Sequence, residues 1–390
     1  MTISKILYKI VNSVVLCATV LSMTGCKDEP APSINPENAE SVTLVYAVAS
    51  NNLYSNLIDD MWEMQYIAPS LNLSKNVVLV YYVNPNGQCT LQKLTVQKGV
   101  GSFAEIKKYD DTPLSVEKDR ISEVIDDVQG LYPNASHGII FWSHASGWRP
   151  WFPAQNDQEF RRTFGSDNYE GVNYQCNITD LAEAIPDHAF KYIWFDCCYM
   201  GNIETYYQLR KKADYVAGYP TEIYDAGMPY ELTLPYLAKR EPDLVGAANQ
   251  LFDYYMQNPY SRLHNVTVSV VRTDLLEGIA EAARPFYTEG FVPTSLLNVN
   301  NYSRYVNYPF YDLEQLLYAY QGMDNETRQA LADALEDAII VRKISDTDFD
   351  HRPLNLNDYS AISVNNYKDT GSRDDLFYTT LDWYIATRQK

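Results

Sequence analysis

Histidine, cysteine and basic residues are scarce in this sequence of 390 residues, and each scarcity excludes a class of function. The chain has 5 histidines and 6 cysteines without a C-x-x-C pair, which argues against a zinc site. Lysine and arginine total 31 against 50 acidic residues, so the net charge of −19 makes nucleic acid and anionic membranes unsuitable partners. No D-x-D-x-D-G loop occurs either, and we therefore expect no metal ion and no cofactor.

The first 25 residues have the pattern of an export signal. Lys5 and Lys9 precede an apolar stretch too short to span a membrane comfortably, and no later stretch has 18 consecutive apolar residues. "SMTGC" resembles a bacterial lipoprotein cleavage site with lipid on Cys26; an ordinary signal peptide is the alternative. The proline-rich residues 26–40 predict a disordered tether. We expect an outer-membrane lipoprotein that faces the periplasm or the cell surface and touches the membrane through this lipid only.

Two of the few cysteines are adjacent, at the end of the apolar run in "KYIWFDCCYMGN". Beyond the signal the chain retains Cys89, Cys176, Cys197 and Cys198, and in an exported protein four cysteines can form two disulfides. Adjacent cysteines are poor partners for each other, because the ring strains the peptide bond between them. The pair can pack in the core, form a disulfide, bind a metal or act as a nucleophile. The neighbouring elements of the sequence are needed to distinguish these roles.

Apolar runs alternate with helical patterns through the first part of the chain. Continuous apolar runs predict buried strands at 41–50, 75–84, 137–144, 191–197 and 214–220. This alternation predicts an α/β fold with a mostly parallel sheet sandwiched by helices. From residue 236 onward the patterns are mainly helical, with strands expected at 266–274 and 359–364, which indicates a helical or mixed C-terminal extension.

Two of the predicted strands end in reactive residues. "FWSH" ends in His144, and "WFDCC" ends in Cys197 and Cys198. The carboxyl ends of parallel strands meet at one edge of a sheet, so we expect the histidine and the cysteines to lie close together. A thiol beside a histidine base can perform nucleophilic catalysis. We interpret the remaining four histidines as surface residues, namely His137, His188, His264 and His351.

"GIIFWSHASGW" and "YIWFDCCYMGN" together resemble the clostripain family of cysteine peptidases, which belongs to the caspase-like clan. The resemblance is to Bacteroidetes-type lipoprotein members and covers residues 41–230 well. It implies a caspase-like peptidase core at 41–235, with residues 236–390 as the C-terminal part of the same domain. The residues that match the family pattern are His144, Gly147, Trp148, Asp196, Cys198 and Met200.

The resemblance implies roles for individual residues. Cys198 would be the nucleophile and His144 the general base, while the backbone N–H groups of Ala145 and Cys198 would form the oxyanion hole. Asp196 and Asp225 would line the pocket for an arginine or lysine side chain of the substrate. Ala145 replaces the usual glycine of the family.

Further implications of the resemblance concern activation and partners. Family members are often activated by cutting themselves, and Arg161 and Arg162 in the polar loop 149–177 are the candidate sites. Some members need calcium. We expect a monomeric, lipid-anchored cysteine endopeptidase that cleaves protein or peptide substrates after Arg or Lys. The alternatives are the same fold with another specificity, or a catalytically silent lipoprotein that only binds a glycan or a partner. Ala145 and Cys197 stand where the family usually has glycine and alanine, and they would become marks of a lost activity if the protein cleaved no peptide.

Overall fold

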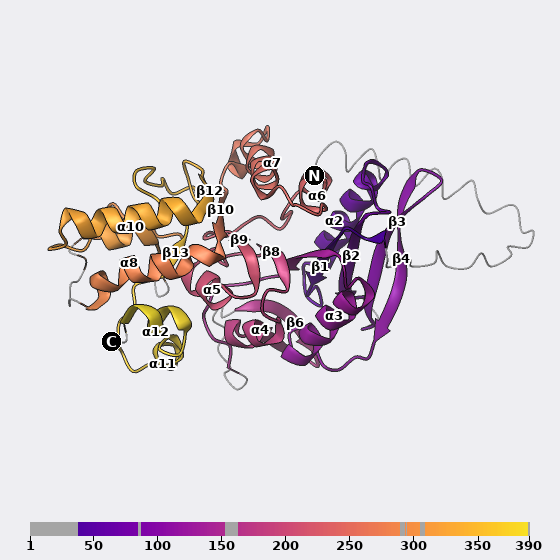
Figure 1. Cartoon of the computed structure of the whole chain (residues 1–390), viewed down its shortest axis with the longest axis horizontal. Helices are drawn as coiled ribbons and strands as arrows, with labels where there is room; N and C mark the ends of the chain where they lie inside the picture. Colours follow the sequence, from indigo (N-terminus) through magenta and orange to yellow (C-terminus); the bar gives the residue numbers. More distant parts are fainter. Residues whose placement is uncertain are drawn as a thin grey trace, which may run out of the picture. The chain divides into compact units, whose positions relative to one another are not determined.

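Nine strands form one mixed sheet in the order β12-β10-β9-β8-β5-β1-β2-β3-β4 (Figure 1). The computed structural model describes residues 38–84, 87–152, 163–288, 293, 295–304 and 309–388. Asn38–Lys390 form one structural unit. The predicted signal segment with Cys26 lies outside the described residues, as do Arg161 and Arg162. No helix in the described ranges has the length and apolarity that a membrane crossing requires.

The centre of the sheet consists of five parallel strands. In sheet order these strands are β9 (Ala213–Gly218), β8 (Phe190–Asp196), β5 (Ser136–Trp142), β1 (Ser41–Ala47) and β2 (Asn76–Val83). These strands correspond to the five apolar runs of the sequence. They are buried along almost their whole length because helices cover both faces, which leaves no solvated face for polar residues to occupy.

Antiparallel strands complete both edges of the sheet. On one side lie β3 (Cys89–Gln97) and β4 (Val100–Tyr109), and on the other β10 (Thr267–Arg272) and β12 (Ile339–Ile344). A separate hairpin follows β5 within the segment interpreted as a polar loop, formed by β6 (Phe164–Tyr169) and β7 (Val172–Cys176). The strand expected at 266–274 corresponds to β10, whereas β4, β6, β7 and β12 were not expected from the sequence.

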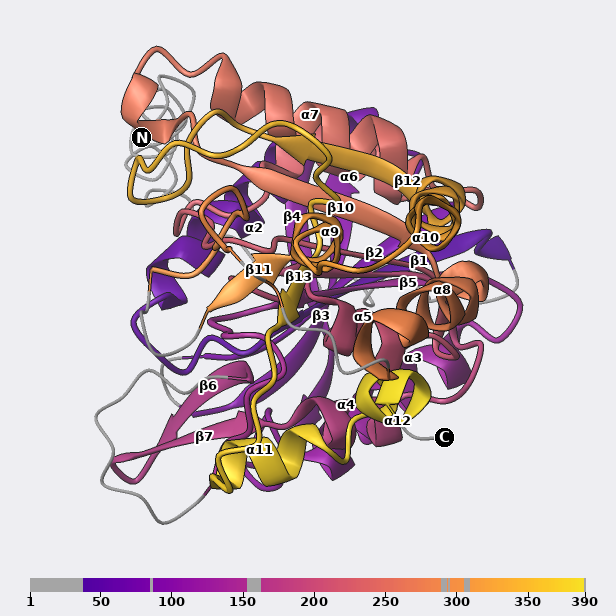
Figure 2. The same ribbon diagram turned by 90° about the vertical axis from the view of Figure 1, so that its left-hand side faces the viewer.

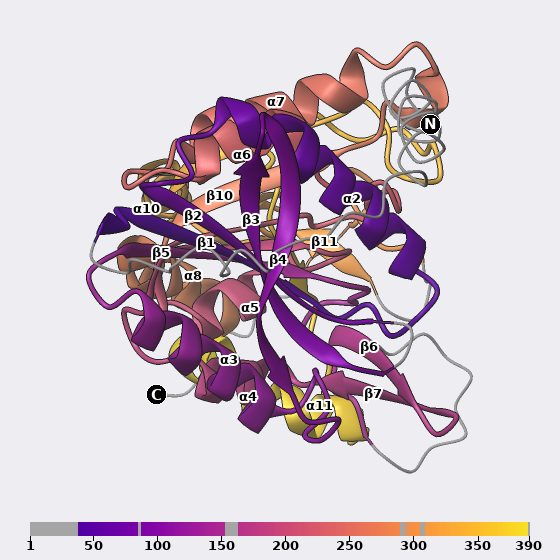
Figure 3. The same ribbon diagram turned by 90° about the vertical axis from the view of Figure 1, so that its right-hand side faces the viewer.

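Two groups of helices sandwich the sheet (Figure 3). One face carries α2 (Tyr54–Ile67), α6 (Tyr230–Leu237) and α7 (Leu244–Met256). The opposite face carries α3 (Lys118–Leu131), α4 (Ile178–Ala184) and α5 (Ile203–Gln208). The predicted α/β class with a mostly parallel, helix-covered sheet is therefore confirmed. Short 3-10 helices occur at Ala68–Ser70, Ser261–Leu263 and Thr273–Leu275.

The C-terminal part extends the layer that contains α5 (Figure 2). Here α8 (Leu276–Thr288) packs against α10 (Asn325–Ala338) and α12 (Asp382–Arg388), and α12 also contacts α5. A small antiparallel sheet joins β11 (Phe310–Asp312) to β13 (Ser363–Asn365). The remaining helices of the described ranges are α9 (Leu313–Tyr318) and α11 (Arg373–Tyr378).

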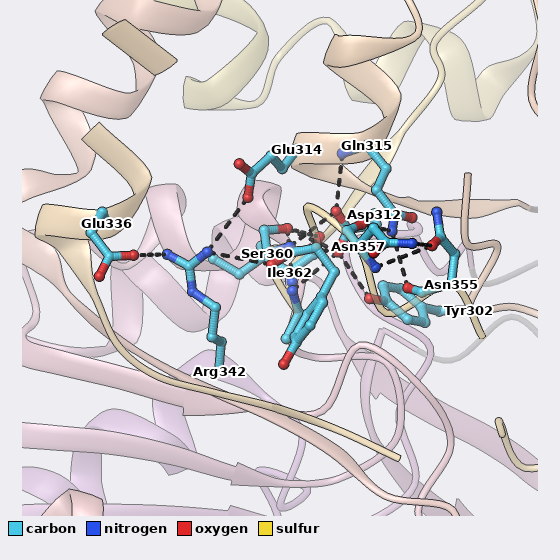
Figure 4. A network of polar contacts seen from close by, with 12 residues as sticks. Tyr302, Asp312, Glu314, Gln315, Glu336, Arg342, Asn355, Asn357, Ser360 and Ile362 are labelled. Atoms are coloured by element: carbon cyan, nitrogen blue, oxygen red, sulfur yellow. Dashed lines mark hydrogen bonds and ion pairs between the residues drawn. The ribbon is translucent and has the colours of Figure 1, made fainter. Parts of the chain in front are cut away.

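The buried Asp312 carboxylate organises this small sheet (Figure 4). It accepts hydrogen bonds from the Ser360 N–H at 3.0 Å, the Ala361 N–H at 3.0 Å and the Tyr302 hydroxyl at 2.8 Å. It also accepts the Gln315 N–H at 3.1 Å, which caps α9. A buried carboxylate needs such donors, and here they come from three separate segments of the chain. Asp312 therefore fixes where residues 360–362 run.

The segment that Asp312 fixes reaches the turn after the cysteine pair. Ser363 N–H donates to the Gly201 carbonyl at 2.9 Å. Two chain positions further, the Asn365 N–H donates to the Glu204 carboxylate at 2.8 Å, and this buried carboxylate also accepts the Tyr378 hydroxyl at 2.9 Å. The C-terminal part is thus directly attached to the turn that follows β8.

Candidate active site

The register of two central strands brings the predicted reactive residues together. β5 and β8 are parallel neighbours, and Trp142 pairs with Asp196 at their carboxyl ends. His144 and Cys198 each lie two residues beyond this pair. Neighbouring strands lie about 4.8 Å apart, so the two segments leave the sheet side by side.

A cavity of about 290 Å³ opens at this edge of the sheet. Its wall includes every described residue for which the sequence predicted a site role: His144, Ala145, Asp196, Cys198 and Asp225. Residues that the sequence interpretation did not assign to the site also line it, including Leu53, Arg304 and Phe349. The sequence thus predicted one wall of the cavity and missed the segments that complete it.

The His144 ring is held by an asparagine that sequence reasoning missed. The Nε2 atom lies 2.9 Å from the Oδ1 atom of Asn52, in the loop between β1 and α2. Its neighbour Asn51 fixes this loop, with Nδ2 donating to the Ser166 carbonyl at 2.6 Å and to the Val48 carbonyl at 3.0 Å. A signal was available, because the carboxyl end of β1 lies beside that of β5 and residues after it face the same edge.

The two adjacent cysteines have different environments. Cys197 is buried and its thiol donates to the Phe141 carbonyl at 3.0 Å, inside the sheet layer. Cys198 is partly exposed, and its Sγ lies 3.7 Å from the Ile223 carbonyl. Burial raises the pKa of the Cys198 thiol to about 12, since few groups around the sulfur stabilise a thiolate. The resting Cys198 is therefore a protonated thiol at neutral pH.

Two backbone donors at the cavity have no acceptor among the described residues. Among the described residues, neither the Ala145 N–H nor the Cys198 N–H makes a backbone or side-chain hydrogen bond. The next donor along the chain, the Tyr199 N–H, is already used by the Thr221 carbonyl at 3.0 Å. The two unused donors lie in the segments that carry His144 and Cys198, which is the arrangement that an oxyanion requires.

Alanine at position 145 causes no backbone strain. Ala145 does not belong to the described non-glycine residues with a positive φ. The glycine that the "HASGW" stretch does require is Gly147, whose φ is +78°. A Cβ atom there would come within 3.0 Å of the Tyr199 carbonyl oxygen and the Asn202 side chain. Gly147 therefore permits the close approach of the histidine segment to the turn after Cys198.

Asp196 forms a buried acidic floor of the cavity. The Met228 N–H donates to both of its carboxylate oxygens at 3.1 Å, and the hydroxyls of Tyr230 and Tyr219 donate at 3.2 and 3.3 Å. Burial nevertheless raises its pKa from 3.8 to about 6. Gly227 permits this loop to approach, because a Cβ atom there would lie 2.9 Å from Asp196.

Three further charged groups line the cavity. Asp225 is exposed, whereas Glu222 is partly buried and pairs with Arg304 at 2.8 Å between Oε1 and Nη2. Burial raises the pKa of Glu222, although the Arg304 guanidinium opposes this effect. Nothing in the local sequence around Arg304 indicated this position, because the contact joins segments 82 residues apart.

Disulfide bonds, a metal site and surface histidines were also considered from the sequence. The four described cysteines are free thiols. In the described ranges no group of three or more His, Cys, Asp or Glu side chains could hold a metal ion. The expectation that His137 lies on the surface is wrong: it is buried and its Nε2 lies 2.9 Å from the Tyr132 carbonyl.

A thiol and a histidine at adjacent carboxyl ends of a helix-covered sheet, with two unused N–H donors, define a cysteine peptidase of caspase-like fold. The chain belongs to the clostripain family, whose model matches residues 45–376, and it is a cysteine-type endopeptidase of that family. The comparison with curated proteins gives no match.

Solved structures share the fold over most of the chain. One is a secreted cysteine protease from Bacteroides thetaiotaomicron in complex with an irreversible peptide inhibitor, with 27% identity and a TM-score of 0.77 over 90% of this chain and 99% of that chain. Another is an inactive zymogen protease from Parabacteroides distasonis, with 25% identity and a TM-score of 0.76 over 92% of this chain and 100% of that chain.

Proposed function

We propose that Cys198 and His144 form a catalytic dyad that hydrolyses peptide bonds in protein or peptide substrates. The observation that carries this proposal is the cavity at the ends of β5 and β8, which both side chains line. The peptide inhibitor bound by the Bacteroides thetaiotaomicron protease supports the same class of ligand for this chain.

The chemistry follows from the protonated state of the resting thiol. His144 accepts the Cys198 proton as sulfur attacks the carbonyl carbon of the substrate, because a thiol with a pKa near 12 does not ionise alone. The N–H groups of Ala145 and Cys198 stabilise the oxyanion. The tetrahedral intermediate collapses to a thioester as His144 protonates the leaving amine, and water then releases the acid and restores the thiol.

Asn52 positions the base in this mechanism. When Nε2–H donates to the Asn52 Oδ1, Nδ1 carries the lone pair of the neutral ring. The ring orientation is then set by the loop that Asn51 anchors to β6. Asn52 is thus a third member of the site beside Cys198 and His144, and it orients the base as the third residue of a catalytic triad does.

Substrate preference follows from the acidic side of the cavity. We propose that Asp196 at the floor and Asp225 at the rim select a cation, so that cleavage occurs after Arg or Lys. Asp196 lies near the bottom and accepts hydrogen bonds from three polar donors, but it forms no ion pair with another described residue. A guanidinium or ammonium group would supply the missing positive charge.

We further propose that the enzyme is a monomer anchored in the outer membrane through lipid on Cys26, facing the periplasm or the cell surface. Self-cleavage after Arg161 or Arg162 would activate it. The position of these arginines supports this idea, because they precede β6, and the Gly165 N–H in β6 donates to the His144 carbonyl at 3.0 Å. Mass spectrometry of the purified chain, with Cys198→Ala as control, would show such a cut only in the active protein.

Fluorogenic peptides that end in Arg, Lys or a neutral residue test the proposed activity. The mature protein should cleave after Arg and Lys, and Cys198→Ala should be inactive while Cys197→Ala retains activity. Cleavage only after neutral residues would retain the dyad but refute the acidic selectors. No cleavage by an intact or a pre-cut form, together with no labelling of Cys198 by a peptidyl thiol reagent, would favour the silent binding protein.

A further inference from the structure

An internal ion pair shares the cavity with the catalytic candidates. Glu222 follows β9, and Arg304 comes from the C-terminal part of the chain. Their side chains meet at 2.8 Å, and 12% of the Glu222 side chain and 38% of the Arg304 side chain are exposed. Both residues line the wall that also contains Cys198. The carboxylate is therefore already paired before any substrate enters.

Several contacts hold the Arg304 guanidinium at this wall. Its Nη1 lies 3.9 Å from the Asp350 Oδ1, on the loop after β12. Its guanidinium carbon is 5.7 Å from the centre of the Phe349 ring, which lines the same cavity. Two carboxylates and an aromatic ring contact this guanidinium, and together they stabilise its position at the cavity wall.

The charge balance of the cavity depends on this arginine. Among the described residues that line the wall, the carboxylates are Asp196, Glu222 and Asp225, and Arg304 is the permanently charged cation. A substrate arginine would bring a second guanidinium to the same group of carboxylates. Because the two guanidinium groups are chemically equivalent, they compete for the same negative charge and repel each other at short range.

We propose that Arg304 is an internal counter-cation of the basic-residue subsite, which weakens the binding of arginine and lysine side chains by neutralising Glu222. Arg304 is thus a specificity-determining residue. Basic substrates bind well only when their contacts with Asp196, Asp225 and the peptide backbone compensate for the neutralised charge of Glu222. This inference rests on the proposed preference for basic side chains.

Agmatine, an arginine analogue without a carboxyl group, tests the inference without requiring catalysis. The measured quantity is the agmatine concentration that halves the rate at which iodoacetamide alkylates Cys198, with the labelled peptide identified by mass spectrometry. The ratio of rates with and without agmatine cancels any change in intrinsic thiol reactivity. The buried Cys89, Cys176 and Cys197 give no competing signal in the folded protein.

Arg304→Gln should lower the half-protecting concentration about fivefold, the size expected for one partly screened charge several ångströms away. Glu222→Gln should raise it by about the same factor, because Arg304 is then uncompensated. The double variant should restore the wild-type value. Arg342→Gln is the matched control, since this arginine pairs with Glu336 at 2.9 Å in the C-terminal part and does not line the cavity (Figure 4).

The outcomes separate this inference from the proposed function. Equal protection of wild type and Arg304→Gln, or weaker protection of the variant, would overturn the role of Arg304 and leave the preference for basic side chains intact. Alkylation of Cys198 that agmatine slows in none of the proteins would overturn that preference and the inference with it. If Arg304→Gln does not fold, an unchanged value for Glu222→Gln overturns the inference by itself.

Discussion

Asp196→Asn should remove a pH dependence of folding that the wild-type protein carries. The Asp196 side chain is 4% exposed, and its donors are one backbone N–H and two tyrosine hydroxyls. These hydrogen bonds stabilise the carboxylate, but burial costs more, so its pKa rises from 3.8 to about 6. The folded protein therefore binds this proton more tightly than the unfolded chain does.

The magnitude follows from the two pKa values. The contribution of Asp196 to the free energy of unfolding is largest below pH 4 and declines as the pH rises to 6, because only the folded state still holds the proton in that range. The full difference is about 3 kcal/mol, of which about 2 kcal/mol falls between pH 4 and pH 7. At neutral pH the buried charge of Asp196 thus lowers the free energy of unfolding.

Urea unfolding of wild type and Asp196→Asn at pH 4, 5, 6 and 7 measures this contribution. Any constant effect of the substitution on packing cancels when the difference between the two proteins is followed with pH. We expect that difference to shift by about 2 kcal/mol in favour of the variant as the pH rises. A difference that is the same at every pH would refute the reasoning. The variant should also lose about 10²-fold in kcat/KM for arginine substrates.

Other substitutions give equally direct expectations. Cys198→Ala should abolish alkylation by a peptidyl chloromethyl ketone, whereas Cys197→Ala should be labelled at the wild-type rate; reversed labelling would assign the nucleophile to Cys197. Asn52→Ala should lower kcat about 10- to 100-fold with little change in KM, because the His144 ring loses its orienting contact, and Asn52→Asp should shift the acidic limb of the pH–rate profile to higher pH. An unchanged profile for Asn52→Asp would contradict that contact. Asp312→Ala should lower the free energy of unfolding by about 3 kcal/mol, since it leaves several buried donors unpaired, and calorimetry measures this loss.

The central strands were predictable from sequence because burial on both faces requires continuous apolar runs. β4 lacks such a run, since its "VGSFAEIKKY" sequence lies at an edge where polar side chains are tolerated. The start of β12 has no signal in the sequence, because α10 ends at Ala338 and the strand begins at Ile339 without a turn residue between them. Only pairing with β10 distinguishes the two elements.

The site was predictable where chain order and sheet order coincide. His144 and Cys198 follow neighbouring parallel strands, so the carboxyl-edge rule for α/β sheets brings them together. Asn52 obeys the same rule after β1 but was overlooked, because an asparagine in a polar loop has no distinctive pattern. Arg304 obeys no such rule. Its contact with Glu222 depends on the course of the C-terminal part, which only the tertiary structure supplies.

The attachment of β13 to the turn after Cys198 affects when this turn can form during synthesis of the chain. The contact between Gly201 and Ser363 closes a chain segment of 162 residues, and Tyr378 donates to Glu204 from still nearer the C-terminus. A ribosome synthesises these residues after the turn, so the turn that follows the thiol lacks these contacts until they emerge. A nascent chain, or one truncated before these residues, therefore lacks the contacts that stabilise this turn. The complete site can form only some time after the cysteine itself has been translated.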